Sequence, residues 1–96
     1  MKISAVKFGE FLMSRPAGRE AAQIICTNFI PLDASEVIEI DFTSVKAIGP
    51  SWLHEVVLGL KGACQNKIQI NTAGNASVIE SLKWVDLESI DDSTRT

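Results

Sequence analysis

The chain has 96 residues, of which 46% are hydrophobic and 22% charged, proportions typical of one globular domain that builds its own core. Residues 1–85 carry eight basic and eight acidic side chains, which excludes the basic face that nucleic-acid binding needs. No apolar run is long enough to span a membrane, and the first residues are too polar for a signal peptide. We therefore expect a cytoplasmic protein with no membrane or nucleic-acid partner.

The N-terminal part of the chain predicts a strand followed by a helix. Residues 2–8 alternate β-branched and polar side chains, which predicts an edge strand. Residues 10–13 fit either a continuation of the sheet or a lead into the helix. Ser14 and Pro16 are typical of a helix start, and the apolar residues that follow at helical spacing predict a helix over about 16–30.

The same alternation continues through the middle of the chain. Residues 37–42 are apolar at most positions, which is typical of a central strand. An apolar stripe at helical spacing predicts a second helix over about 50–64. Residues 67–71 alternate cleanly and predict a third strand with one buried face.

A last helix completes the predicted order of elements. It begins near Asn75 or Ser77, where Ser77 opens a capping-box pattern, and it ends near Val85. The order β-α-β-α-β-α predicts a single small α/β domain over residues 1–86, with a mixed sheet whose parallel central strands are covered by helices. We expect residues 87–96 to form an acidic flexible tail.

The two cysteines, Cys26 and Cys64, fall within apolar helical patterns. Their spacing matches neither a CxxC motif nor a Cys/His metal site. We therefore expect buried free thiols rather than a disulfide or a zinc site, and no metal or cofactor.

The most specific pattern follows the second predicted strand. Ile-Asp-Phe-Thr-Ser-Val at 40–45 and Ala-Ile-Gly-Pro-Ser-Trp-Leu-His-Glu-Val at 47–56 resemble the STAS-like domain of unknown function found in bacteria. The segment 14–19 resembles it too, so that the likeness covers roughly residues 12 to 62. Residues 75–87 are similar to the last helix of the true STAS domains, the anti-sigma factor antagonists.

This resemblance implies a regulatory module that binds a partner protein. In the antagonists, a partner kinase phosphorylates a serine at the start of the helix after the central strand, and the surrounding surface docks that kinase. Here the corresponding run is Gly49, Pro50 and Ser51, so the acceptor position falls on Pro50 and Ser51 is the neighbour able to carry a phosphate. The other interpretation is that Ser51 caps or packs in the first helical turn. The expected docking site is this helix start and the loop 43–50, and the expected partner a kinase- or ATPase-type regulator.

The sequence predicts no enzyme. A Gly-Pro-Ser run between a strand and a helix resembles a nucleophile elbow, and His54 follows Ser51 by one turn. However, Leu53 replaces the second glycine, and nothing supplies a third catalytic group or an oxyanion hole. We expect His54 and Leu58 on the exposed face of the helix, where Leu58 indicates a docking surface.

Anion binding at the same helix start is the alternative function. Arg15 and Arg19 are a like-charge pair at the start of the first helix, so they need an anionic partner such as Glu20, Asp41 or the phosphate of a ligand. Asp41 ends the central strand, where open α/β sheets place functional groups, but it also suits accepting hydrogen bonds from the loop. A homodimer through the first strand or through Trp84 is a third possibility.

Overall fold

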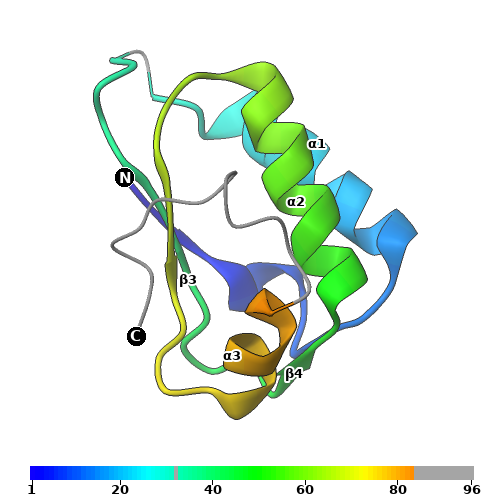
Figure 1. Cartoon of the computed structure of the whole chain (residues 1–96). Coiled ribbons are helices and arrows are strands. Elements are labelled where there is room, and N and C mark those ends of the chain that lie inside the picture. The colour runs from blue at the N-terminus through cyan, green and yellow to red at the C-terminus, as the bar shows by residue number, and fades with distance from the viewer. Residues whose placement is uncertain (32, 84–96) are drawn as a thin grey trace.

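Alternating apolar and polar stretches fold into alternating strands and helices, which the computed structural model describes over residues 1–31 and 33–83 (Figure 1). The elements are β1 (Lys2–Ser4), a 3-10 helix (Ala5–Phe8), β2 (Phe11–Leu12), α1 (Arg15–Asn28), β3 (Ile38–Asp41), β4 (Ala47–Ile48), α2 (Pro50–Ala63), β5 (Ile68–Asn71) and α3 (Ala76–Leu82). The β-α-β-α-β-α order is confirmed, with two short strands added. The expected tail 87–96, Trp84 and the helix end near Val85 lie outside the described residues.

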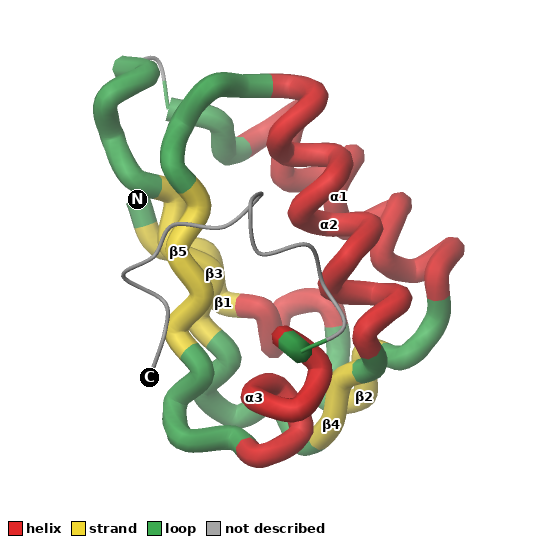
Figure 2. Tube along the Cα trace, in the orientation of Figure 1, coloured by secondary structure: helices red, strands yellow, loops and turns green. Residues whose placement is uncertain are grey.

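The main sheet has the order β1-β3-β5, so β1 is an edge strand and β3 is central, as predicted (Figure 2). Ile40 pairs with Ile3 on one side and with Ile70 on the other, and both pairings are parallel. All pairings among the described strands are parallel, where a mixed sheet was expected. The isoleucines of the three strands are buried, whereas Glu39 lies on the opposite, more exposed face. The central strand is therefore covered by helices on one face.

β1 is shorter than the predicted strand over residues 2–8. After Ser4 the chain turns into the 3-10 helix, in which Ala5 is fully buried against the core. Gly9 ends this helix with a φ of 130°, a conformation that favours glycine, and its N–H donates to the carbonyl of Val6. The turn then leads the chain into β2.

β2 and β4 form a separate two-stranded parallel sheet that the sequence did not reveal. α3 closes the other edge of β4, because the Ser77 hydroxyl accepts a hydrogen bond from the Ile48 N–H at 2.9 Å and donates one to the Ile48 carbonyl at 3.0 Å. Asn75 caps α3, since its side chain accepts from the N–H groups of Ser77 and Val78. Of the two predicted helix starts, Asn75 is thus the correct one.

α1 and α2 lie side by side on the sheet, within two residues of their predicted bounds (Figure 1). Small residues allow their close approach. A Cβ atom on Gly18 would lie 2.7 Å from the Trp52 carbonyl oxygen, and one on Gly59 would lie 2.6 Å from the Ala22 Cβ. Ser14 caps α1 as predicted, accepting from the Ala17 N–H at 3.2 Å. Any residue other than glycine at position 18 or 59 would force the two helices to move.

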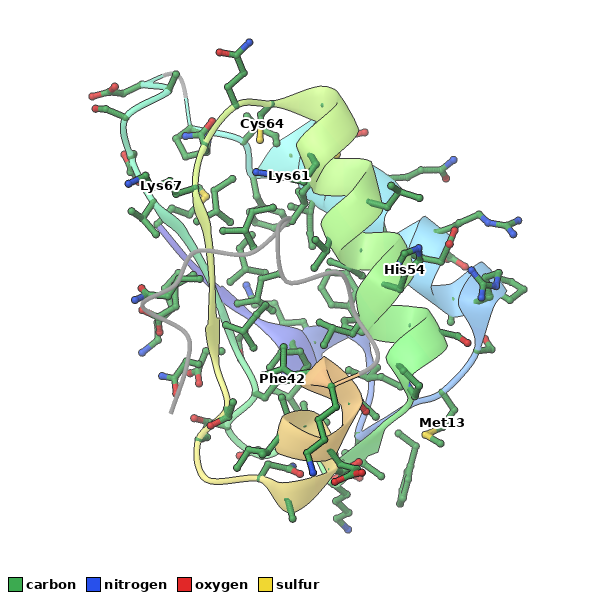
Figure 3. The ribbon with its side chains drawn as sticks, in the orientation of Figure 1. Met13, Phe42, His54, Lys61, Cys64 and Lys67 are labelled. Carbon is green, nitrogen blue, oxygen red and sulfur yellow. The ribbon has the colours of Figure 1, made fainter. Side chains whose placement is uncertain are left out.

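Trp52 is the largest side chain of the core that α2 shares with the sheet. It is 1% exposed, and its ring meets the edge of Phe42 at 6.1 Å between centroids. Phe42 points into the space between sheet and helices (Figure 3). Cys26 and Cys64 are free thiols, but each is partly rather than fully buried. Among the helices in the described residues, none has the length and apolar character to cross a membrane.

Candidate functional site

The first turn of α2 gathers three of the predicted site residues. Gly49 is the N-cap and has no side chain to accept from the helix, so the first backbone N–H groups are not capped by a side chain. The N–H of Gly49 donates to the carbonyl of Leu12 at 2.9 Å, and a Cβ atom at Gly49 would lie 3.2 Å from the Met13 carbonyl oxygen. β2 therefore holds this helix start, and Pro50 and Ser51 follow it.

A hollow of about 320 Å³ opens beside this turn, lined by Arg15, Pro50, Ser51 and His54. Ser51 and His54 are both partly buried, and Figure 3 shows His54 on the outer side of α2. Ser51 does not cap the helix, because the N-cap position belongs to Gly49. The structure thus brings together four predicted residues from two helices.

Glu55 holds both arginines of α1. Arg15 donates from Nη1 to one carboxylate oxygen of Glu55 at 2.7 Å, and Arg19 donates from Nε to the other at 2.9 Å. The prediction that Glu20 or Asp41 pairs with these arginines is wrong, because Glu55 of α2 accepts from both guanidinium groups. The hydrogen bond from Arg19 and the interactions with Arg15 lower the pKa of Glu55. Desolvation of the carboxylate acts in the opposite direction but is outweighed, so the pKa lies below its ordinary value.

Asp41 stands apart from this cluster. Its Oδ1 accepts from the Thr43 N–H at 3.2 Å and from the Thr43 hydroxyl at 2.8 Å, and Lys2 Nζ lies 3.7 Å from Oδ2. Burial acts to raise the pKa of Asp41, but these hydrogen bonds and the Lys2 charge outweigh it and lower the pKa. Asp41 therefore orders the loop after β3, and the structure does not bring it to the arginines.

Leu58 lies on a second, neighbouring surface. It is 54% exposed and lines a groove of about 290 Å³ between α1 and α2, together with Arg19 and Cys26. Glu55 also lines this groove, while Arg15 lines the hollow at the helix start. The arginine–glutamate cluster thus separates the groove from the hollow.

Sequence reasoning missed two exposed apolar side chains, one in β2 and one in the segment between β2 and α1. Phe11 is 65% exposed and Met13 56% exposed, whereas Leu12 between them is 2% exposed. Met13 lies beside the first turn of α2 and points away from the core (Figure 3). Alternation along a strand places Phe11 and Met13 on one face and Leu12 on the other. Because all three side chains are apolar, the sequence alone does not indicate which face is exposed.

Within the described part of the chain, no three His, Cys, Asp or Glu side chains gather in a way that could hold a metal ion. The residues able to meet a charged ligand are those of the hollow. The Arg15 side chain is 48% exposed, and a guanidinium carries more donors than its bond to Glu55 uses.

Comparison with known proteins identifies the family. Residues 21–92 match the family described as a STAS-like domain of unknown function. This match covers most of the chain, so the protein belongs to that family, as its resemblance indicated. The matched region begins after the segment 14–19, which also resembles this family. No curated protein and no solved structure matches the chain significantly.

Proposed function

Because the chain belongs to a family of STAS-like domains, we propose that it is a non-enzymatic regulatory module that binds a partner protein at the start of α2. The docking surface consists of Phe11, Met13, Pro50 and Ser51. The partner class that we propose is a kinase- or ATPase-type regulator, as in the antagonists that the sequence resembles.

The observation that carries this proposal is the exposure of two apolar side chains, Phe11 in β2 and Met13 beside the start of α2. Both are more than half exposed, while the strand residue between them belongs to the core. Large apolar side chains exposed together on a rigid edge are typical of binding surfaces. β2 is held by β4 and by the start of α2, so the pair is presented on an ordered support.

Ser51 places a modifiable hydroxyl within the same surface. It is partly buried in the first helical turn, next to the hollow that Arg15 and His54 line. A negative charge there would meet the unpaired N–H groups and positive end of the α2 dipole. An apolar partner packed on Phe11 and Met13 would have to desolvate that charge, so phosphorylation of Ser51 would weaken the complex.

Affinity capture with matched variants tests this surface. The immobilised full chain is exposed to lysate of the native cells, retained proteins are identified by mass spectrometry, and the best retained partner is purified for titration. We expect Phe11→Thr, Met13→Thr and Ser51→Asp each to weaken its binding by about tenfold or more, as changes at the centre of an interface do.

Of two exposed apolar residues away from this surface, one provides the control and the other tests an alternative docking site. Ile24 of α1 is 37% exposed, and Ile24→Gln should bind as the wild type does. Leu58→Gln tests the groove between α1 and α2. Loss of binding in Leu58→Gln alone would move the site to that groove, and equal binding by all variants would contradict a docking surface at the helix start.

Anion binding is the second candidate function, favoured by the hollow of about 320 Å³ that Arg15, Ser51 and His54 line. Thermal shift measurements with inorganic phosphate, nucleotides and phosphoesters test it. A ligand at 100 times its dissociation constant should stabilise the protein by about 2.7 kcal/mol. The shift should disappear in Arg15→Gln, and a protein that none of these anions stabilises would contradict this function.

A further inference from the structure

The two cysteines, one in α1 and one directly after α2, lie at the same end of the helix layer. Cys26 lies in α1, and Cys64 is the residue directly after α2, at the end far from the docking surface (Figure 3). The Cys26 Sγ is 3.8 Å from the Gly59 carbonyl oxygen, and the Cys64 Sγ is 3.3 Å from the Leu60 carbonyl oxygen. Both sulfurs therefore contact the carbonyl groups of two consecutive residues, whose Cα atoms are only about 3.8 Å apart.

The close approach of α1 and α2 accounts for these neighbouring contacts. Ala22 lies one turn before Cys26 and touches α2 so closely that Gly59 has no room for a Cβ atom. A disulfide needs Cα atoms about 4.4–6.8 Å apart. The two backbones come this close one turn before Cys26, where a Cβ atom on Gly59 would lie 4.0 Å from the Ala22 Cα.

The surroundings of the thiols leave them accessible to small reagents. Cys26 lines the groove that also holds Leu58, and Cys64 is likewise only partly buried. Desolvation raises the pKa of Cys26, and the charge of the nearby Cys64 thiolate raises it further. This influence of one thiol on the other agrees with their contacts to neighbouring carbonyl groups of α2.

We propose that Cys26 and Cys64 form a reversible disulfide that links α1 to the end of α2 when the protein meets a small disulfide such as oxidised glutathione. The thiolate of one cysteine attacks a glutathione sulfur, forms a mixed disulfide and releases one glutathione thiolate. The other cysteine, once deprotonated, attacks the protein sulfur of that mixed disulfide and releases the second glutathione. The two protein thiols lose two electrons and two protons in total, and the glutathione disulfide accepts them.

Intact-mass measurement of the full chain after incubation with oxidised glutathione tests the proposal. We expect a monomer lighter by two hydrogen atoms, without bound glutathione, which dithiothreitol returns to the starting mass. Cys26→Ser and Cys64→Ser each lack the second thiol, so they should instead retain one glutathione. Stable addition of two glutathiones to the wild type, a disulfide-linked dimer or an unreacted protein would each overturn the proposal.

Two further readouts separate a disulfide that fits the native fold from one that distorts it. The oxidised protein should have a thermal midpoint several degrees above that of the reduced protein, because the bond restrains the unfolded chain. A lower midpoint would show that the bond strains the fold and would contradict the proposed geometry. The rate of disulfide formation should rise with pH above neutrality, because the raised pKa of Cys26 keeps its thiolate scarce at neutral pH.

Discussion

The half of α2 that faces α1 and the outer side of its first turn differ in how completely their groups are used within the fold. In the half that faces α1, Gly59 meets Ala22 and Trp52 meets Gly18 so closely that no side chain could be added. Outside the first turn, Met13 is exposed, as is Phe11 of β2, and no side chain caps the helix. One helix thus combines a tightly packed half that orders the domain with an outer side of its first turn whose binding capacity the domain itself does not use.

The polar side chains of α2 differ in the same way. Glu55 accepts hydrogen bonds from both Arg15 and Arg19, so each of its carboxylate oxygens is paired across the two helices. Ser51 and His54, on the same helix, instead face an open hollow. The stability of the fold should therefore depend on the packed half, and partner binding should depend on the first turn.

Gly18→Ala should have the largest effect, because it adds a methyl group to the packed half. The new Cβ would lie 2.7 Å from a backbone oxygen of Trp52, so the two helices would have to move apart. We expect the free energy of unfolding to fall by about 1–3 kcal/mol, measured by urea denaturation.

Gly62→Ala is the matched control for that substitution. Gly62 is also helical, but a Cβ atom there would meet nothing within 4 Å. Alanine should then raise the free energy of unfolding by about 0.5–1 kcal/mol through its better helix propensity. Equal effects of the two substitutions would show that the α1–α2 contact is not as tight as the structure indicates.

Ser77→Ala tests the support behind the docking surface. The Ser77 hydroxyl pairs with both the N–H and the carbonyl of Ile48, a buried residue of β4, and only the carbonyl has a second donor, Ser81. Loss of the hydroxyl leaves a buried N–H unpaired, which should cost about 1–2 kcal/mol of unfolding free energy. Ser35→Ala, in an exposed turn, is the control and should change it little. An equally small effect of Ser77→Ala would mean that water replaces the hydroxyl.

Local patterns explain which parts of this arrangement were predictable. An apolar stripe at helical spacing is recognisable within a few turns, and Ser14 also marks the start of α1. Both long helices were therefore predicted nearly to their ends. β4 was not found and β2 was only one of two alternatives for residues 10–13, because strands of two residues carry too little pattern and form only where the fold brings them together. Glu55 was missed as the partner of the arginines because it lies 36 and 40 residues away in the sequence.

The candidate site divides in the same way. The helix start at Gly49, Pro50 and Ser51 was predicted from its residue types, and the structure places it as a helix start. The apolar pair beside it was not predicted, because residues 10–13 fit a strand and a helix lead-in equally well. Only their pairing with β4 decides which side chains face outward.

Low pH should reduce the free energy of unfolding through protonation of Glu55, by less than the substitutions above. Its pKa is lowered from an ordinary 4.5 in the folded state, so its contribution is complete above that value and is lost as pH falls through the lower folded pKa. Glu55→Gln should therefore lose less stability than the wild type when urea denaturation is repeated through this pH range. The Asp33 carboxylate also has a lowered pKa but accepts only from Ser35 in its own turn, so Asp33→Asn is the control. An identical acid slope in Glu55→Gln and the wild type would contradict the role of the arginine–glutamate cluster.

Phe11→Thr should have the smallest effect on stability although, among the residues that the structure describes, it removes the most exposed large apolar side chain. Threonine suits a strand, and the phenyl ring is mostly in solvent already, so the free energy of unfolding should change by no more than about 0.5 kcal/mol. Chemical denaturation measures this on the same samples that are used for partner titration. A loss of about 3 kcal/mol would instead mark Phe11 as a core residue and would remove the docking surface from the start of α2. Unchanged stability with weakened partner binding is the combination that only an exposed residue of a binding surface produces, and it would separate the two halves of α2 by function.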